Sequence, residues 1–172
     1  MVRPLLAALT LSVALATPAQ ARVTDPAAVN TLDLRLDAGL ATPVGALGGV
    51  LSVPWRYAAA EVGAGLGVTG VHLSVMPKVI PARWGRNLLL VGVGGNVVLP
   101  VTGLPMARER TWWLTGEVAF QRTIFIDNVL YLGAGITRGS YYNQCLNEGN
   151  TMCGGEQKVL WPELRVGFGR RY

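Results

Sequence analysis

Hydrophobic residues take every second position in several segments of the chain, most clearly in the stretch TLDLRLDAGL. Leu34 and Leu36 fall on one face of an extended strand there, whereas Asp33, Arg35 and Asp37 fall on the other, because successive strand side chains point to opposite sides. The same alternation recurs in GVHLSVM, TWWLTGEVAFQRTIFI and VLYLGAGI. The pattern therefore predicts an all-β protein whose strands have one apolar and one polar face.

Eight segments are predicted to be strands, and they cover residues 31–41, 44–53, 57–67, 70–79, 87–98, 111–124, 128–138 and 159–172. Short turns are expected at residues 54–55, 81–86 and 127–128, and the other connections include PVTGLPMARER and the polar GSYYNQCLNEGNTMCGGEQK. Short turns at one end of a sheet and longer loops at the other are typical of bacterial outer-membrane barrels, in which the turns face the periplasm.

The N-terminus has the three parts of a secretory signal in the expected order. Arg3 supplies the positive charge, the run LLAALTLSVALA the apolar core, and the small-x-small triplet ending at Ala21 the cleavage site. The apolar core is shorter than the roughly 20 residues that a membrane-spanning helix needs. We therefore expect a signal peptide at residues 1–21 and one mature domain at residues 22–172.

The composition raises a conflict that the strand pattern resolves. The chain is 51% hydrophobic and only 15% charged, whereas about a quarter of the residues are charged in typical globular proteins. After the signal peptide, however, no stretch reaches the 18 unbroken apolar residues of a membrane helix. Tilted strands of about 9 to 11 residues also cross a bilayer if their sheet closes. We predict an eight-stranded antiparallel up-and-down transmembrane β-barrel, and a water-soluble sandwich stays open as the alternative.

Tryptophans fall near both predicted ends of this barrel. Trp55 and Trp84 lie at the predicted periplasmic turns, while Trp112, Trp113 and Trp161 open strands at the opposite rim. Amphipathic rings favour both membrane interfaces, so their placement agrees with a barrel that spans a membrane.

The C-terminal segment PELRVGFGRRY ends in the aromatic Tyr172 and carries Leu164, Val166 and Phe168 at alternate positions. It resembles the closing strand of outer-membrane β-barrel proteins, and the whole chain resembles the small eight-stranded barrels typified by outer membrane protein A. The resemblance implies export to the outer membrane of a Gram-negative cell. It also implies that the barrel assembly machinery reads these four residues as an assembly signal, and that lipid and lipopolysaccharide surround the barrel.

Charged residues on the inward faces are expected to fill the lumen, because an eight-stranded barrel is just wide enough for side chains. The predicted lumen charges are Asp33, Arg35, Asp37, Glu61, Glu117, Glu163 and Arg165, with His72 and Arg171 as further candidates. Buried charges must be paired, so we predict a mixed-sign ionic network and a structural or surface-interaction role. A narrow channel for ions or small solutes is a further alternative, because inward glycines such as Gly63 and Gly92 leave free volume.

An enzymatic alternative rests on His72 and Ser74, two residues apart on one strand face. The pair is similar to the His-x-Ser pair of the lipid A deacylase barrels, in which His activates Ser for attack on an ester and an acid orients the His. Glu61 is the candidate acid, across a hairpin. The surrounding VHLSVMP lacks the rest of that family's pattern, and the alternation turns His72 inward, away from the lipid.

Cys145 and Cys153 lie in the longest loop. Thiols are oxidised outside the inner membrane, so we predict a disulfide that staples this extracellular loop. Two thiols with the chain's single His on another strand make a poor zinc site, and we expect neither a metal nor a cofactor. The mature chain has 14 basic and 10 acidic residues, a net charge of +4, but the basic residues are scattered. No nucleic-acid partner is therefore expected, and the barrel is expected to be a monomer.

Overall fold

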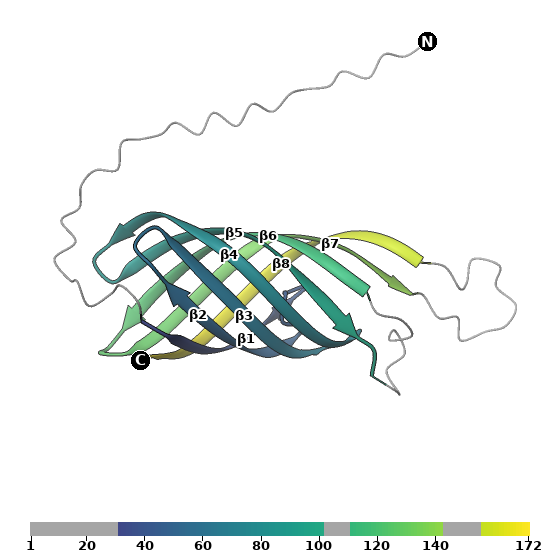
Figure 1. Cartoon of the computed structure of the whole chain (residues 1–172), viewed down its shortest axis with the longest axis horizontal. Coiled ribbons are helices and arrows are strands. Elements are labelled where there is room, and N and C mark those ends of the chain that lie inside the picture. Colours follow the sequence, from purple (N-terminus) through teal and green to yellow (C-terminus); the bar gives the residue numbers. More distant parts are fainter. Residues whose placement is uncertain (1–30, 102–110, 143–155) are drawn as a thin grey trace, which may run out of the picture.

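The fold is a closed β-barrel in a computed structural model that describes residues 31–101, 111–142 and 156–172 (Figure 1). Each strand pairs antiparallel with the next, and the last pairs with the first. The strands are β1 (Asp33–Leu40), β2 (Leu47–Pro54), β3 (Ala58–Gly67), β4 (Gly70–Trp84), β5 (Asn87–Leu99), β6 (Thr111–Ile124), β7 (Asn128–Tyr142) and β8 (Glu156–Arg171). The predicted all-β, up-and-down barrel of eight antiparallel strands is confirmed.

The barrel closes where β1 pairs with β8, from Asp33 opposite Arg171 to Leu40 opposite Leu164. Two backbone hydrogen bonds between Leu32 and Tyr172, of 3.1 and 2.8 Å, extend this seam beyond the two strands. The C-terminus therefore lies at the end that carries the β2–β3, β4–β5 and β6–β7 turns (Figure 1). A closed sheet has no edge strand, so no row of unpaired backbone groups is left.

Side chains alternate between the outside and the lumen as the sequence pattern predicts. Along β1, Leu34 and Leu36 are 46% and 68% exposed, whereas Arg35 between them is 1% exposed. The other strands repeat this alternation with large apolar side chains outside, while their inward faces carry charged and polar side chains together with a buried apolar cluster that includes Ile80, Leu88 and Leu90. The outer surface is thus apolar and the charged side chains lie in the interior, which is the reverse of the arrangement in a water-soluble protein.

The end of β4 differs from the expected boundary. A turn is predicted at residues 81–86, but β4 continues through Pro81 to Trp84, and only Gly85 and Arg86 separate it from β5. The pairing with β5 shifts register between Val79 and Ala82, which marks a bulge around Pro81. Proline has no N–H to donate, and a bulge is a place in a sheet where that loss is tolerated. The left-handed backbone of Gly85 (φ 55°) then makes the tight turn.

The start of β2 also differs, because residues 41–46 fold into the barrel instead of extending β2. We call this segment the inward loop. Val44 at its tip is completely buried. Asn96 of β5 donates a hydrogen bond to the carbonyl of Pro43 (2.8 Å), and Thr137 of β7 donates one to the carbonyl of Ala41 (2.9 Å). Side chains from the opposite wall thus hold the loop inside the lumen.

Candidate functional site

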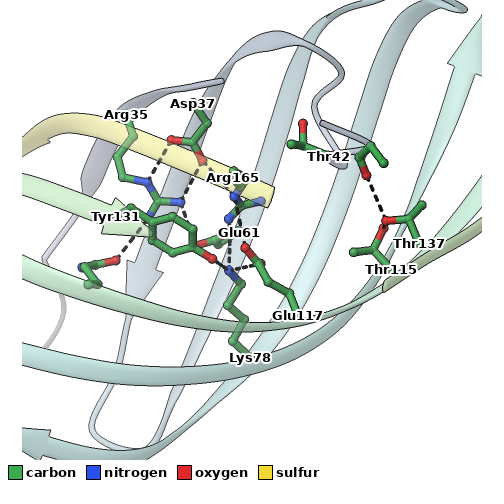
Figure 2. Close-up of polar contacts among 12 residues, drawn as sticks. Arg35, Asp37, Thr42, Glu61, Lys78, Thr115, Glu117, Tyr131, Thr137 and Arg165 are labelled. Carbon is green, nitrogen blue, oxygen red and sulfur yellow. Dashed lines mark hydrogen bonds and ion pairs between the residues drawn. The ribbon is translucent and has the colours of Figure 1, made fainter. Parts of the chain in front are cut away.

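Six charged side chains meet in the middle of the lumen, and we call them the ionic layer: Arg35, Asp37, Glu61, Lys78, Glu117 and Arg165. They come from β1, β3, β4, β6 and β8, and each is at most 4% exposed. The alternation of each strand turns these residues inward. Figure 2 shows them gathered around the ring of Tyr131.

Glu61 is the anion that the three cations share. Its carboxylate oxygens lie 2.9 Å from Arg35 Nη2, 2.9 Å from Lys78 Nζ and 2.6 Å from Arg165 Nη2. Arg165 and Glu61 lie on strands that are not neighbours in the sheet, so this ion pair crosses the lumen. The carboxylate of Glu61, on β3, therefore forms ion pairs with side chains from three other strands, β1, β4 and β8.

The remaining carboxylates complete the pairing. Asp37 lies 3.3 Å from Arg35 and from Arg165, and Glu117 lies 2.8 Å from Lys78 and 3.3 Å from Arg165. Three cations thus face three carboxylates, which balances the charge of the layer. Such balance is needed because an unpaired buried charge costs several kcal/mol.

Tyr131 of β7 provides the centre of the ionic layer. The Arg35 and Arg165 guanidinium carbons lie 4.1 and 4.5 Å from its ring centroid, and Lys78 Nζ lies 4.6 Å from it. Lys78 also donates a hydrogen bond to the Tyr131 hydroxyl. Cations at these distances are attracted by the electron-rich ring face, so the aromatic ring reinforces the ion pairs.

Inward glycines make room for the ionic layer. Gly167 lies opposite Asp37 in the β1–β8 pairing, and an added Cβ there would lie 2.1 Å from the Asp37 carboxylate. Glu117 pairs with Gly135, and a Cβ added at Gly133, two residues before Gly135 on the same strand, would lie 1.9 Å from the Glu117 carboxylate. Gly63, on another strand, would meet Val44 of the inward loop at 2.4 Å. The free volume expected at these glycines is therefore filled by neighbouring side chains, and that argument for a channel is wrong.

A second, smaller ionic cluster lies at the β1–β8 seam, near the C-terminus. Arg171 Nε lies 2.7 Å from Asp33, and Gln121 donates a 2.8 Å hydrogen bond to the same carboxylate. Gln121 also accepts a hydrogen bond from Arg35 (3.1 Å), which connects this cluster to the ionic layer. Glu163, by contrast, is 1% exposed, and neither of its carboxylate oxygens has a hydrogen-bond partner among the described residues.

The structure does not assemble a catalytic triad from His72, Ser74 and Glu61. The His72 ring nitrogens lie 3.0 Å from Thr69 Oγ1 and 3.3 Å from Asn96 Nδ2, while Ser74 donates a 3.3 Å hydrogen bond to the carbonyl of Gly63. Glu61 pairs with the cations of the ionic layer instead. All three side chains are buried. Acyl transfer requires a nucleophile that is hydrogen-bonded to a base, and a base that is hydrogen-bonded to an acid. These three residues do not form such a chain.

Above the inward loop, at the end of the lumen opposite the short turns, lies a cavity of about 420 Å³ that we call the vestibule. Its walls include Trp113 and Trp161, whose rings meet edge to face with centroids 6.4 Å apart. Thr137, which also lines the cavity, shares a 2.9 Å hydrogen bond with Thr115 (Figure 2). The upper lumen is thus apolar and neutral, in contrast to the ionic layer.

Sequence reasoning missed two residues in the middle of the lumen, Lys78 of the ionic layer and Tyr131 at its centre. Both occupy the next inward position, two residues further along a strand, after Met76 in the case of Lys78 and after Val129 in the case of Tyr131. Cys145 and Cys153 lie outside the described residues, as does the predicted signal peptide, so the disulfide and the cleavage site stay predictions. Comparisons of the chain with protein-family models, with curated proteins and with solved structures found no match.

Proposed function

We propose that the chain is a bacterial outer-membrane barrel that closes its own lumen and has a structural or surface-interaction role. The observation that carries this proposal is the reversed polarity of the closed sheet. Apolar side chains such as Leu36, Val75 and Ile136 are 68%, 59% and 56% exposed around the outside. A continuous apolar exterior is unfavourable in water, whereas lipid tails match it.

The rims of the barrel support the same proposal. Trp55 and Trp84 are exposed near the short turns, and Trp112 is exposed at the opposite end. Their amphipathic rings suit the two membrane interfaces. Phe168 faces outward from β8, near the C-terminal Tyr172, in keeping with the proposed signal for the assembly machinery.

The ionic layer argues for a closed lumen. Its ion pairs and the Tyr131 ring span the interior of the barrel, and the inward loop covers them toward the vestibule. Moving a hydrated ion through this region would require breaking buried ion pairs, each of which is costly to separate. The barrel itself is therefore the proposed functional unit, with its loops exposed to the cell exterior.

The test is to fractionate cell membranes and compare the electrophoretic mobility of the protein with and without boiling. A closed membrane barrel stays folded in cold detergent and migrates differently after heating, because its backbone hydrogen bonds are satisfied within the sheet. We expect the heat-dependent shift in the outer-membrane fraction, and no stepwise conductance in planar bilayers. A soluble periplasmic protein without a shift would overturn the proposal, and a steady conductance would contradict the closed lumen.

A further inference from the structure

The vestibule has the size and position of a small-molecule site. Its volume of about 420 Å³ falls within the roughly 300 to 1,000 Å³ of typical ligand pockets, and the mouth of a β-barrel is a recurrent place for them. The inward loop forms part of its lining through Ala41, Thr42 and Gly45. The cavity is therefore bounded by a segment that is itself hydrogen-bonded to the opposite wall.

The lining selects an apolar, uncharged ligand. Trp113 is 7% exposed and Trp161 is 45% exposed, so one ring of the pair is packed into the wall and the other is partly exposed. No Asp, Glu, Lys or Arg is among the described residues that line the cavity. A charged ligand would lose its hydration there without gaining a counter-ion, whereas a flat apolar ligand gains two aromatic contacts.

One polar group in the lining lacks a partner. Asn96 is 4% exposed, and its amide nitrogen donates to the carbonyl of Pro43 and lies beside His72. Its Oδ1 atom is buried with no hydrogen-bond partner among the described residues. The carbonyl of Pro43 can only accept, so it holds the amide nitrogen on that side and leaves the oxygen unpaired. An unpaired buried acceptor is unfavourable until a donor reaches it.

From these three features we propose that the vestibule binds a small, uncharged, largely apolar molecule that carries one hydrogen-bond donor. The aromatic or aliphatic body packs against Trp113 and Trp161, and the donor, a hydroxyl or an amide N–H, reaches Asn96 Oδ1. This ligand-binding activity goes beyond the proposed structural role, because a closed barrel does not need it.

The test uses 2-naphthol as the probe and the full-length mature protein in phosphatidylcholine nanodiscs, with binding measured by titration calorimetry. Empty nanodiscs account for partition of the probe into lipid. We expect saturable binding at one site per barrel. Trp161→Ala is expected to weaken binding about tenfold, since it removes one aromatic wall. Absence of saturable binding above the empty-nanodisc signal would overturn the proposal.

Trp112→Ala is the matched control. Trp112 is next to Trp113 in the chain, but it faces outward and is 64% exposed, and it does not line the vestibule. Its affinity for 2-naphthol should stay within twofold of the parent protein. The heat-dependent mobility shift reports whether each variant still forms a closed barrel. An equal loss of affinity in both tryptophan variants would place the probe in the lipid-facing belt and overturn the proposal.

Two further probes test the polar part of the assignment. 2-Methylnaphthalene has the same shape as 2-naphthol without the donor, and we expect about fivefold weaker binding after correction for lipid partition. 2-Naphthoate has the same rings with a carboxylate, and we expect at least tenfold weaker binding because no cation lines the vestibule. Equal affinity of the first two probes would overturn the role of Asn96, and tight binding of 2-naphthoate would overturn the requirement for an uncharged ligand.

Discussion

The two regions of the lumen are built on the same strands but differ in almost every physical property. The ionic layer is filled by charged side chains that cross the barrel, with Glu61 in contact with three cations. The vestibule, on the other side of the inward loop, is hollow and is lined by tryptophan, threonine, histidine, asparagine and small residues. The same eight strands therefore enclose both the filled ionic layer and the hollow vestibule.

The difference comes from which residues stand beside one another on neighbouring strands. In the ionic layer a long charged side chain lies opposite an inward glycine, as Asp37 lies opposite Gly167 and Glu117 opposite Gly135. The Asp37 carboxylate lies over Gly167 itself, and the Glu117 carboxylate lies over Gly133, two residues before Gly135 on β7. Near the vestibule the inward glycines, such as Gly65, are covered by the backbone of the inward loop. Glycine thus allows close packing in both regions. It makes room for side chains in the ionic layer and for the backbone of the inward loop near the vestibule.

The largest expected effect is the loss of the shared anion. Glu61→Gln keeps the shape of the side chain but leaves Arg35, Lys78 and Arg165 with one carboxylate fewer. We expect the free energy of unfolding to fall by about 3–5 kcal/mol, the cost of breaking a buried ion pair on one side. Urea titration in phosphatidylcholine vesicles, followed by tryptophan fluorescence, measures it. A loss below about 1 kcal/mol would contradict the central position of Glu61.

An intermediate effect is expected where the inward loop packs on β3. A Cβ added at Gly65 would lie 2.2 Å from the carbonyl oxygen of Val44, a backbone atom that only a shift of the loop can move away. Gly65→Ala should therefore lower the free energy of unfolding by about 1–3 kcal/mol, as overpacking of a filled interior does. Gly49→Ala is the control, because nothing lies within 4 Å of its added Cβ. The same urea titration applies, and equal losses in the two variants would refute this packing of the loop.

The smallest effect is expected at Glu163, which receives the same substitution as Glu61 in the same lumen. Its carboxyl group has no hydrogen-bond partner among the described residues, so Glu163→Gln replaces it without breaking an ion pair. The free energy of unfolding should change by less than about 1 kcal/mol, and toward greater stability, because a buried amide is less costly than a buried unpaired carboxylate. A destabilisation as large as that of Glu61→Gln would show that Glu163 has a partner in the membrane.

The sequence by itself determined the barrel and the sidedness of its strands. Alternation in TLDLRLDAGL placed Leu34 outside and Arg35 inside, since a period of two leaves a strand no other way to separate its apolar and polar residues. It also predicted β6 at Thr111–Ile124, where the structure has it. Local pattern was sufficient for these features because each depends only on neighbours along one strand.

Only the tertiary structure decided how the lumen is filled. The pattern did not show that Arg165 would meet Glu61 across the barrel, that Pro81 would sit at a bulge within β4, or that residues 41–46 would turn inward. Each of these depends on the register between strands and on contacts between walls that are distant in the chain. The division between a sealed ionic layer and a hollow vestibule exists only once the sheet has closed, because closure is what brings those walls within reach of one another.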